Sequence, residues 1–396
     1  MSYTVRRVEY ADLEGWGPLG VAAFGGKVPE VPTPEAFAQL PGRRWGSFEE
    51  EALHARLLVL GASSWYHGRR VPTACLAGVA VAPEQRGRGL LRPLLEAVHR
   101  EAVEQGEVLA LLYPTAPGIY RGAGYEVIGS YDDVELPLAD LARLRPAAGV
   151  TTRRAEEEDV PALEALYERW AAAQNGPLTR AEPPFRVPAA ERIRSTTGIT
   201  VAEEGGRVTG MVAWHRGEGY LPQTAIMQVE ELLATTPGAA GALWAVLGSF
   251  SSVVGRVRVS TSGIDPAWLV LPGLGRSVVR SRPVMLRVLD VAGALEGAAL
   301  APLTARVPFA VTGAGLDGTY LLEAEEGRAS CRRTGESGED LTEGPVLSAQ
   351  GLALLYAGAQ SAANLRSAGL LTGPTAYDDL LTGLFGGRQV HIRDSF

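Results

Sequence analysis

The sequence predicts an α+β protein of three consecutive blocks, and three observations support this. First, 396 residues are enough for two to four domains. Second, a strand, a glycine turn, a striped helix and another strand follow one another between residues 74 and 113, the pattern of a βαβ unit with parallel strands. Third, this order of elements recurs further along the chain. The predicted blocks are residues 1–146, 147–284 and 285–396.

The first block contains the βαβ unit. Its strands are the apolar runs 74–81 and 108–113, and between them apolar side chains at helical spacing predict a helix from about residue 90. Pro93 falls in the first turn of this helix, where its missing N–H costs no hydrogen bond. The segment 136–146 has the character of a connector to the second block.

The second block opens with four acidic residues, 156–159, at the positive end of a predicted helix whose apolar face reaches Trp170. Trp170, Trp214 and Trp244 are expected in its core. Its further predicted elements are strands at 198–202, 209–214, 225–230 and 257–262 and a helix at 241–252. Because this order echoes the first block, we expect a divergent duplication.

The third block is predicted to combine a few strands with short helices. Strands are expected at 318–324 and 329–332, and helices at 347–356 and 361–368, before a tail at 387–396.

Composition excludes several classes of protein. With 46% hydrophobic and 21% charged residues, the chain is neither disordered nor collagen-like. The net charge of −8 disfavours binding to nucleic acid or anionic membranes and suits a cationic partner. Two isolated cysteines and five histidines without HxxxH spacing predict no metal site. No apolar run is long enough to span a membrane and no signal core is present, so a cytoplasmic protein is expected.

The turn Arg86-Gly87-Arg88-Gly89 lies between the first strand and the helix of the βαβ unit. Backbone N–H groups at a helix N-terminus bind anions, and the two glycines let a ligand approach the backbone. Both arginines can donate charge-assisted hydrogen bonds to phosphate. An isolated turn of this kind is usually a solvated basic loop, but its place between strand and helix favours a pyrophosphate site.

Three phosphate-binding motifs compete for this turn. A nucleoside-triphosphate loop requires a GK[ST] ending, which is absent, and a dinucleotide fingerprint requires glycine where Arg92 stands. The acetyl-CoA loop of GCN5-related N-acetyltransferases, R/Q-x-x-G-x-G/A, fits best, except that Leu91 replaces the last small residue.

Tyr120 is the candidate catalytic side chain. It follows the second strand of the βαβ unit by a few residues, and a phenol there can protonate a departing thiolate. Tyr125 is interpreted as structural. Cys75, on the first strand, is interpreted as core because nothing nearby in the sequence would activate its thiol.

Four segments resemble the enhanced intracellular survival (Eis) family of GCN5-related N-acetyltransferases. They are VAVAPEQRGRGLLRPLLEAVHR (79–100), GIYRGAGY (118–125), EALYERW (164–170) and MLRVLDVAGALE (285–296). The resemblance implies tandem acetyltransferase (GNAT) domains with mixed, splayed sheets, the second degenerate, and a C-terminal sterol-carrier-protein-like domain. It also implies acetyl-CoA as co-substrate, an amine acceptor such as an aminoglycoside, a polyamine or a lysine side chain, and a hexamer.

The resemblance assigns roles to individual residues. Val79, Ala80 and Val81 would bind the pantetheine arm through their backbone. Arg86, Gly87, Arg88, Gly89, Leu90 and Leu91 would hold the pyrophosphate. Tyr120 would be the general acid, and the carboxylate of Phe396 the general base, with Asp394 a second acid nearby.

The acceptor pocket and the second block depart from the family pattern. Lys27 stands where an acid is expected, which would repel polycations. The turn at 230–240 in the second block carries acids and no arginine, so this block is predicted to bind no CoA. The alternative function is a carrier of small apolar ligands that is regulated by CoA and has no turnover.

Overall fold

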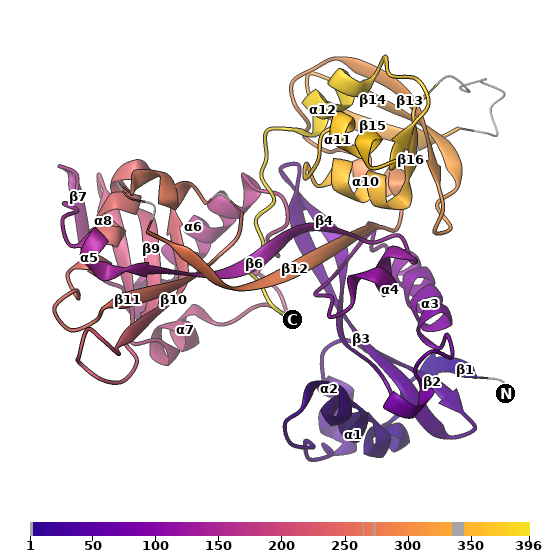
Figure 1. Ribbon diagram of the computed structural model, residues 1–396, viewed down its shortest axis with the longest axis horizontal. Helices are drawn as coiled ribbons and strands as arrows, with labels where there is room; N and C mark the ends of the chain where they lie inside the picture. The colour runs from indigo at the N-terminus through magenta and orange to yellow at the C-terminus, as the bar shows by residue number, and fades with distance from the viewer. Residues whose placement is uncertain (1–2, 264, 272, 274, 335–343) are drawn as a thin grey trace.

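The computed structural model describes residues 3–263, 265–271, 273, 275–334 and 344–396. The chain forms three lobes (Figure 1). Two lobes lie side by side and are bridged by two long strands, and the third lies above the first, while the C-terminus ends between them.

The first lobe contains the predicted βαβ unit. Strand β4 and strand β5 are parallel and are connected through helix α3, which confirms the prediction. An antiparallel β1–β4 meander extends the sheet. The strands are β1 (Thr4–Arg7), β2 (Arg43–Glu49), β3 (Ala52–Tyr66), β4 (Arg69–Val81) and β5 (Leu109–Leu112). The helices are α1 (Leu13–Phe24), α2 (Pro34–Gln39), α3 (Leu91–Glu104) and α4 (Pro117–Arg121).

The second lobe repeats this arrangement. Strands β10 and β11 are parallel and are joined by α8, as β4 and β5 are joined by α3. The elements are β7 (Val150–Arg154), α6 (Val160–Ala172), α7 (Ala189–Ser195), β8 (Gly198–Glu204), β9 (Arg207–His215), β10 (Ile226–Ala234), α8 (Pro237–Gly248) and β11 (Arg256–Thr261). The helix predicted at 241–252 begins earlier because Thr236 caps it and Pro237 starts it. Trp170, Trp214 and Trp244 are buried, as predicted.

The two lobes exchange a strand. Strand β6 (Glu126–Pro137) follows β5 in the chain but pairs with β11 of the second lobe. Strand β12 (Ser277–Val288) follows β11 but pairs with β5 of the first lobe, and β6 and β12 pair with each other. A single 12-stranded sheet results. Residue 285, the predicted start of the third block, therefore falls inside β12.

The segment 136–146 is not the simple connector that the sequence predicts. Its first two residues complete β6, and α5 (Leu138–Leu141) follows at once. Leu138 and Leu141 are almost fully buried in the core of the second lobe, where they pack against α8. Apolar side chains at helical spacing form one face that is stable only when buried. Because β6 pairs with the second lobe, the helix that follows it buries its leucines in the core of that lobe.

The third lobe is an α+β unit with a five-stranded sheet. The predicted strands and helices are present, whereas the strands β13, β16 and β17 and the helices α9 and α12 were not predicted. The elements are α9 (Val291–Leu295), β13 (Ala305–Thr312), β14 (Gly318–Glu325), β15 (Arg328–Arg333), β16 (Val346–Ser348), α10 (Ala349–Tyr356), α11 (Ala362–Ser367), β17 (Leu371–Thr372) and α12 (Asp378–Phe385). Its core continues into the first lobe through Cys75, Leu109 and Leu111.

Asn175 and His67 join all three lobes. The His67 backbone N–H donates to Asn175 Oδ1 over 2.9 Å, and His67 Nε2 lies 2.6 Å from the carbonyl oxygen of Tyr356. Asn175 Nδ2 donates to the Ala357 carbonyl over 3.0 Å. The Asn175 backbone also pairs with the C-terminal tail at Gln389 and His391. Because both side chains are buried, each hydrogen bond that is lost leaves an unsatisfied polar group.

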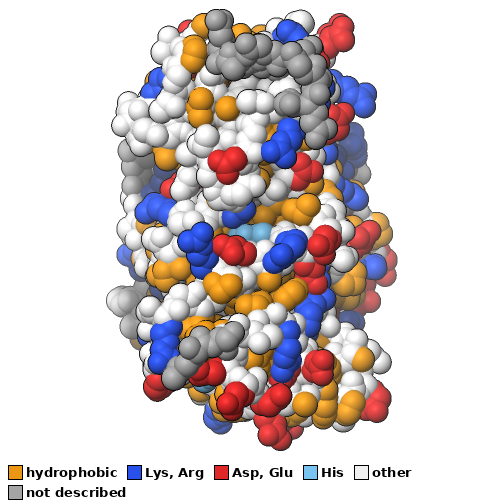
Figure 2. Space-filling view, turned by 90° about the vertical axis from the view of Figure 1, so that its right-hand side faces the viewer, with side chains coloured by type: hydrophobic (Ala, Val, Ile, Leu, Met, Phe, Trp, Pro, Cys, Tyr) orange, Lys and Arg blue, Asp and Glu red, His pale blue; other side chains and the backbone are white. Residues whose placement is uncertain are grey.

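The surface charge is mixed on the face that Figure 2 shows. Lysine and arginine side chains alternate there with aspartate and glutamate, and small groups of hydrophobic side chains lie between them. No helix within the described residues is both long and apolar enough to cross a membrane.

The buried imidazole of His67 predicts a loss of stability in acid. Burial lowers the pKa of His67 to about 4, from an ordinary value of 6.5. Between these two pH values the unfolded chain binds a proton that the folded chain does not, so stability falls as the pH drops from 6.5 toward 4. His67→Gln keeps a donor for the Tyr356 carbonyl and should flatten this dependence by about one proton. Urea midpoints at several pH values measure it, with half-buried His215→Gln as the control; an unchanged slope in His67→Gln would contradict the prediction.

Candidate functional site

Strands β4 and β5 separate where the candidate site begins. They pair only from Thr73 to Leu76 of β4, opposite Leu109 to Leu112, while β4 continues to Val81. Between residues 77 and 80 the register of β4 against β3 shifts, and Gly78 has a φ of 56°. Such a bulge leaves backbone groups unpaired within the sheet. The site-facing end of β4 therefore offers main-chain donors and acceptors beside a gap in the sheet.

The predicted residues of this strand end differ in exposure. Val79 and Val81 are half-buried, and the side chain of Ala80 lies in the core. That these residues bind a ligand through their backbone stays a prediction.

The turn after β4 is open. Gly87 and Gly89 have φ angles of 79° and 77°, and a Cβ added at either would meet no atom within 4 Å. Arg86 is exposed, its backbone N–H donates to the Pro83 carbonyl over 3.4 Å, and its guanidinium has no hydrogen bond or ion pair to any described residue. The Arg88 guanidinium already has partners within the chain, since its Nη1 donates to Tyr3 Oη over 2.8 Å and to Gln85 Oε1. Arg86 is thus the arginine of this turn that is available to a phosphate.

The N-terminus of α3 is also available. Leu90 occupies the cap position without a capping side chain, its own side chain is buried, and that of Leu91 is half-buried. The first N–H groups of a helix have no partner within the helix, so an uncapped end presents them to a ligand. Leu90 and Leu91 can contribute here through their backbone only.

The matching helix end in the second lobe is closed. Thr236 Oγ1 accepts from the Ala239 N–H over 3.1 Å and also donates to Glu204. A Cβ at Gly238 would come within 3.0 Å of the Glu204 carboxylate. The capping hydroxyl and the negative charge both oppose an anion at this end.

Tyr120 lies on α4, just after β5. It is 6% exposed and packs with residues of α3 and β4, and burial raises the pKa of its phenol to about 12. The phenol is therefore protonated at neutral pH. Tyr125 is fully buried and its Oη lies 2.8 Å from His99 Nε2, as expected of a structural residue. Cys75 is fully buried, and burial raises the pKa of its thiol, which fits a core role.

The C-terminal tail enters a cavity of about 940 Å³ between the first two lobes. Phe396 packs edge-on against Tyr113, the residue directly after β5, and against Phe185. The Tyr113 hydroxyl donates to the backbone carbonyl of Asp394. These contacts place the chain end beside the point where β4 and β5 separate.

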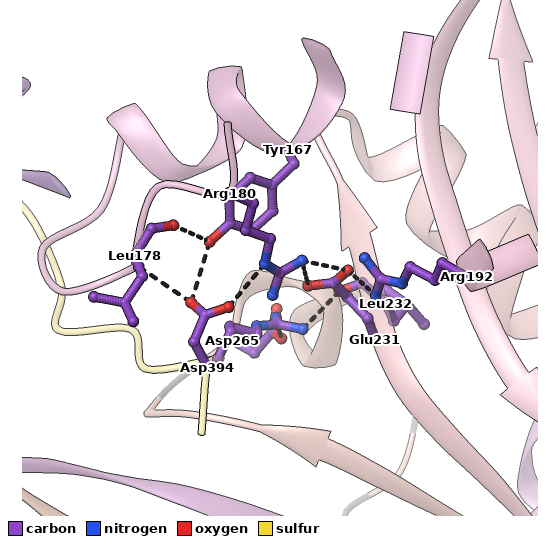
Figure 3. A network of polar contacts seen from close by, with 9 residues as sticks. Tyr167, Leu178, Arg180, Arg192, Glu231, Leu232, Asp265 and Asp394 are labelled. Carbon is purple, nitrogen blue, oxygen red and sulfur yellow. Dashed lines mark hydrogen bonds and ion pairs between the residues drawn. The ribbon is translucent and has the colours of Figure 1, made fainter. Parts of the chain in front are cut away.

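Asp394 is part of a buried ionic network (Figure 3). Its Oδ1 accepts from Arg180 Nε over 2.7 Å, and its Oδ2 accepts from the Leu178 N–H and the Tyr167 hydroxyl. Arg180 also donates to Glu231. The sequence predicts Asp394 as a second acid near the chain end, and this role stays a prediction; Asp394 lines the cavity, and its carboxylate is paired with Arg180.

Glu231 is the second acid of this network. Burial alone would raise the pKa of Glu231, but the charges of Arg180 and Arg192 outweigh burial and lower it well below its usual value. No local pattern predicted these residues, since Arg180 and Asp394 are 214 positions apart.

Lys27 does not lie in this cavity. It is exposed in the connection between α1 and α2 and is not among the residues that line the cavity. The effect of Lys27 on cationic acceptors stays a prediction, since the cavity wall from this lobe is made by β2, β3 and the two residues Leu40 and Pro41 before β2.

The fold and the splayed site define a GCN5-related N-acetyltransferase. Family models described as acetyltransferase (GNAT) domain match residues 4–128 and 176–288, and a sterol carrier protein domain matches residues 291–393. These matches confirm tandem GNAT domains followed by a sterol-carrier-protein-like domain.

The relatives identify the family. An uncharacterized N-acetyltransferase of Streptomyces griseus is 30% identical over 75% of this chain and 75% of its own. N-acetyltransferase Eis of Mycobacterium tuberculosis is 29% identical over 76% of this chain and 74% of its own. A GCN5-related N-acetyltransferase structure from Kribbella flavida superposes with a TM-score of 0.81, at 28% identity, over 100% of this chain and 98% of its own. The chain belongs to the Eis family of N-acetyltransferases.

Arg180→Gln tests whether the ionic network anchors the tail. The substitution leaves two buried carboxylates without their shared cation, which should cost about 2–4 kcal/mol of stability. Digestion by carboxypeptidase should become faster as the tail is released. Arg306→Gln removes an exposed pair with Glu323 and is the control, expected to cost less than about 1 kcal/mol. An equally resistant tail in Arg180→Gln would refute the anchoring role.

Proposed function

We propose that this N-acetyltransferase transfers the acetyl group of acetyl-CoA directly to a primary amine, of a small molecule or of a lysine side chain, in a ternary complex. The observation that carries the proposal is the gap between β4 and β5. The Arg86 turn follows β4 and leads into α3, whose N-terminus has no capping side chain. Acetyl-CoA binds in this gap as the co-substrate of GNAT domains.

The residues present fit acetyl-CoA. The backbone of residues 79–81 is exposed to the gap and can pair with the amide groups of the pantetheine arm. The N–H groups of Gly87, Gly89, Leu90 and Leu91 surround open space that can hold a pyrophosphate. Arg86 adds a charge-assisted hydrogen bond. The second lobe lacks these features and is proposed to shape the cavity without binding CoA.

Tyr120 and the Phe396 carboxylate have complementary tasks in this proposal. A main-chain N–H near the bulge polarises the thioester carbonyl. The Tyr120 hydroxyl, which burial keeps protonated, gives its proton to the departing CoA sulfur. The carboxylate of Phe396 accepts the proton that the attacking amine loses. The hexamer implied by the family and the cytoplasmic location expected from the sequence remain predictions.

The proposal is tested by CoA release with a panel of amines. An N-acetyltransferase releases one CoA for each acetylated amine, and mass spectrometry identifies the product. A CoA-regulated carrier of apolar ligands, which the sterol-carrier-like lobe makes conceivable, would release none with any acceptor. That outcome would replace the proposed function by the carrier.

Tyr120→Phe tests the general acid. Removing the hydroxyl should lower kcat about 100-fold while the KM for acetyl-CoA changes less than about 3-fold, because the ring still fills its place in the core. Tyr125→Phe, another loss of a buried phenol on the same segment, is the control and should keep kcat within about 3-fold. Normal kcat for Tyr120→Phe across the pH range would eliminate the role.

Adding one glycine after Phe396 tests the general base. The extra residue moves the terminal carboxylate by about 3.5 Å and puts a neutral amide in its place. We expect kcat to fall at least about 10-fold, with acetyl-CoA binding retained in calorimetry. Ser395→Ala, which keeps the carboxylate, is the control. Unchanged turnover by the extended chain would dismiss the carboxylate as the base.

A further inference from the structure

The cavity at the C-terminus is lined by six arginines, and five of them are paired with carboxylates. Arg180 and Arg192 contact Glu231, Arg280 and Arg282 contact Asp133, and Arg393 contacts Asp265. Arg44 is the sixth. Its Nη1 donates only to the carbonyls of Pro41 and Gly42, and it has no acidic partner within the described residues.

Arg56 lies next to Arg44 on the same face of the sheet. Arg44 of β2 is directly opposite Leu58 of β3, and Arg56 is two residues from Leu58, so all three side chains point the same way. Leu58 and Leu60 line the cavity together with Arg44. Diagonal neighbours of this kind are about 7–8 Å apart, within reach of two long side chains and one shared ligand.

Arg56 is not itself among the residues that line the cavity, but its contacts connect it to the β4 bulge. Its Nε donates to the carbonyl of Gly78, the residue at the β4 bulge, over 3.2 Å. Its Nη1 donates to the Trp16 carbonyl over 2.6 Å, and its guanidinium stacks on the Trp16 ring at 4.1 Å. A Cβ at Gly20 would lie 2.5 Å from Nη1, so glycine there leaves room for this arginine. The Nη2 group has no hydrogen bond to a described residue.

The two guanidiniums carry positive charge that the described residues do not neutralise. Burial, and then the neighbouring charge of Arg44, lower the pKa of Arg56 to about 10; burial also lowers the pKa of Arg44. A half-buried pair of like charges without an acid is unfavourable, and a bound anion would relieve it. The five other arginines that line the cavity with Arg44 are all paired with carboxylates, some of which they share.

We propose that Arg44 and Arg56 form an anion subsite for the acceptor, so that the acetylated amine carries a carboxylate or a phosphate on the same small molecule. This inference rests on the proposed function and narrows it to one class of acceptor. The anion binds between the two guanidiniums and orients the amine toward the thioester beside the β4 bulge. Amino acids and phosphorylated amines belong to this class, whereas polyamines and aminoglycosides meet two uncompensated cations.

Matched acceptors test the proposal with the wild-type protein. β-Alanine and ethanolamine phosphate present a carboxylate and a phosphate, ethanolamine is their neutral counterpart, and ethylenediamine and spermidine carry further positive charge. We expect kcat/KM for an anionic amine to exceed that for ethanolamine about 10- to 100-fold, with the diamines lowest. The ratio between β-alanine and ethanolamine phosphate distinguishes a carboxylate from a phosphate subsite.

Arg44→Gln should lower kcat/KM for the anionic amines about 10-fold more than for ethanolamine, mainly through KM. Arg280→Gln removes a cavity arginine that already has Asp133 as its partner, and is the matched control that should leave the ratio unchanged. Arg56→Lys keeps the charge but not the bidentate geometry, and should reduce the preference in part. If a variant does not fold, as judged by circular dichroism, the wild-type ratios decide alone.

The acceptor panel distinguishes a failure of the anion subsite from a failure of the proposed function. CoA release with neutral or cationic amines but no preference for anionic ones would overturn the anion subsite and leave the proposed function intact. No CoA release with any amine would overturn the proposed function, and the subsite with it.

Discussion

The pairing of β6 with β12 is the interaction on which the rest of the structure depends. Each strand leaves its own lobe and completes the sheet of the other, so backbone hydrogen bonds run without a break from β1 to β7. Neither lobe could keep its sheet if the other were removed, because β5 and β11 would become open edges. The cavity between the lobes is therefore built on a rigid connection, although its walls come from distant parts of the chain.

The C-terminal tail is bound at the junction between the lobes. Asn175 pairs with the tail at one end of the junction, and the network of Arg180, Glu231 and Asp394 anchors it at the other. Burying these charges costs desolvation energy, which hydrogen bonds and mutual attraction offset only when every partner is present. Such a network is better suited to set the position of the chain end than to add stability. It brings Phe396 to the separation of β4 and β5, where the proposed chemistry takes place.

The electrostatics of the acceptor side differ from the charge of the whole chain. The net charge is −8, yet the cavity has more arginines than acids in its wall. Five of these arginines are paired with carboxylates, whereas Arg44 in the wall and Arg56 next to it have no acidic partner within the described residues. A global charge acts over long distances and is screened by salt, whereas an acceptor at the site interacts with the few groups it touches.

The sequence by itself determined the βαβ unit, the position of the glycine–arginine turn at the start of α3 and the position of Tyr120 just after β5, because each depends on residues that are neighbours in the chain. Apolar runs, helical stripes and the glycines of the turn act locally, so the first lobe, the repeated order in the second and the family could be predicted. The fate of segment 136–146, the neutralisation of Asp394 and the exposure of Lys27 were decided by the tertiary structure alone. Strand exchange and ionic contacts such as Arg180 with Asp394 join residues more than a hundred positions apart, and no local pattern specifies such partners.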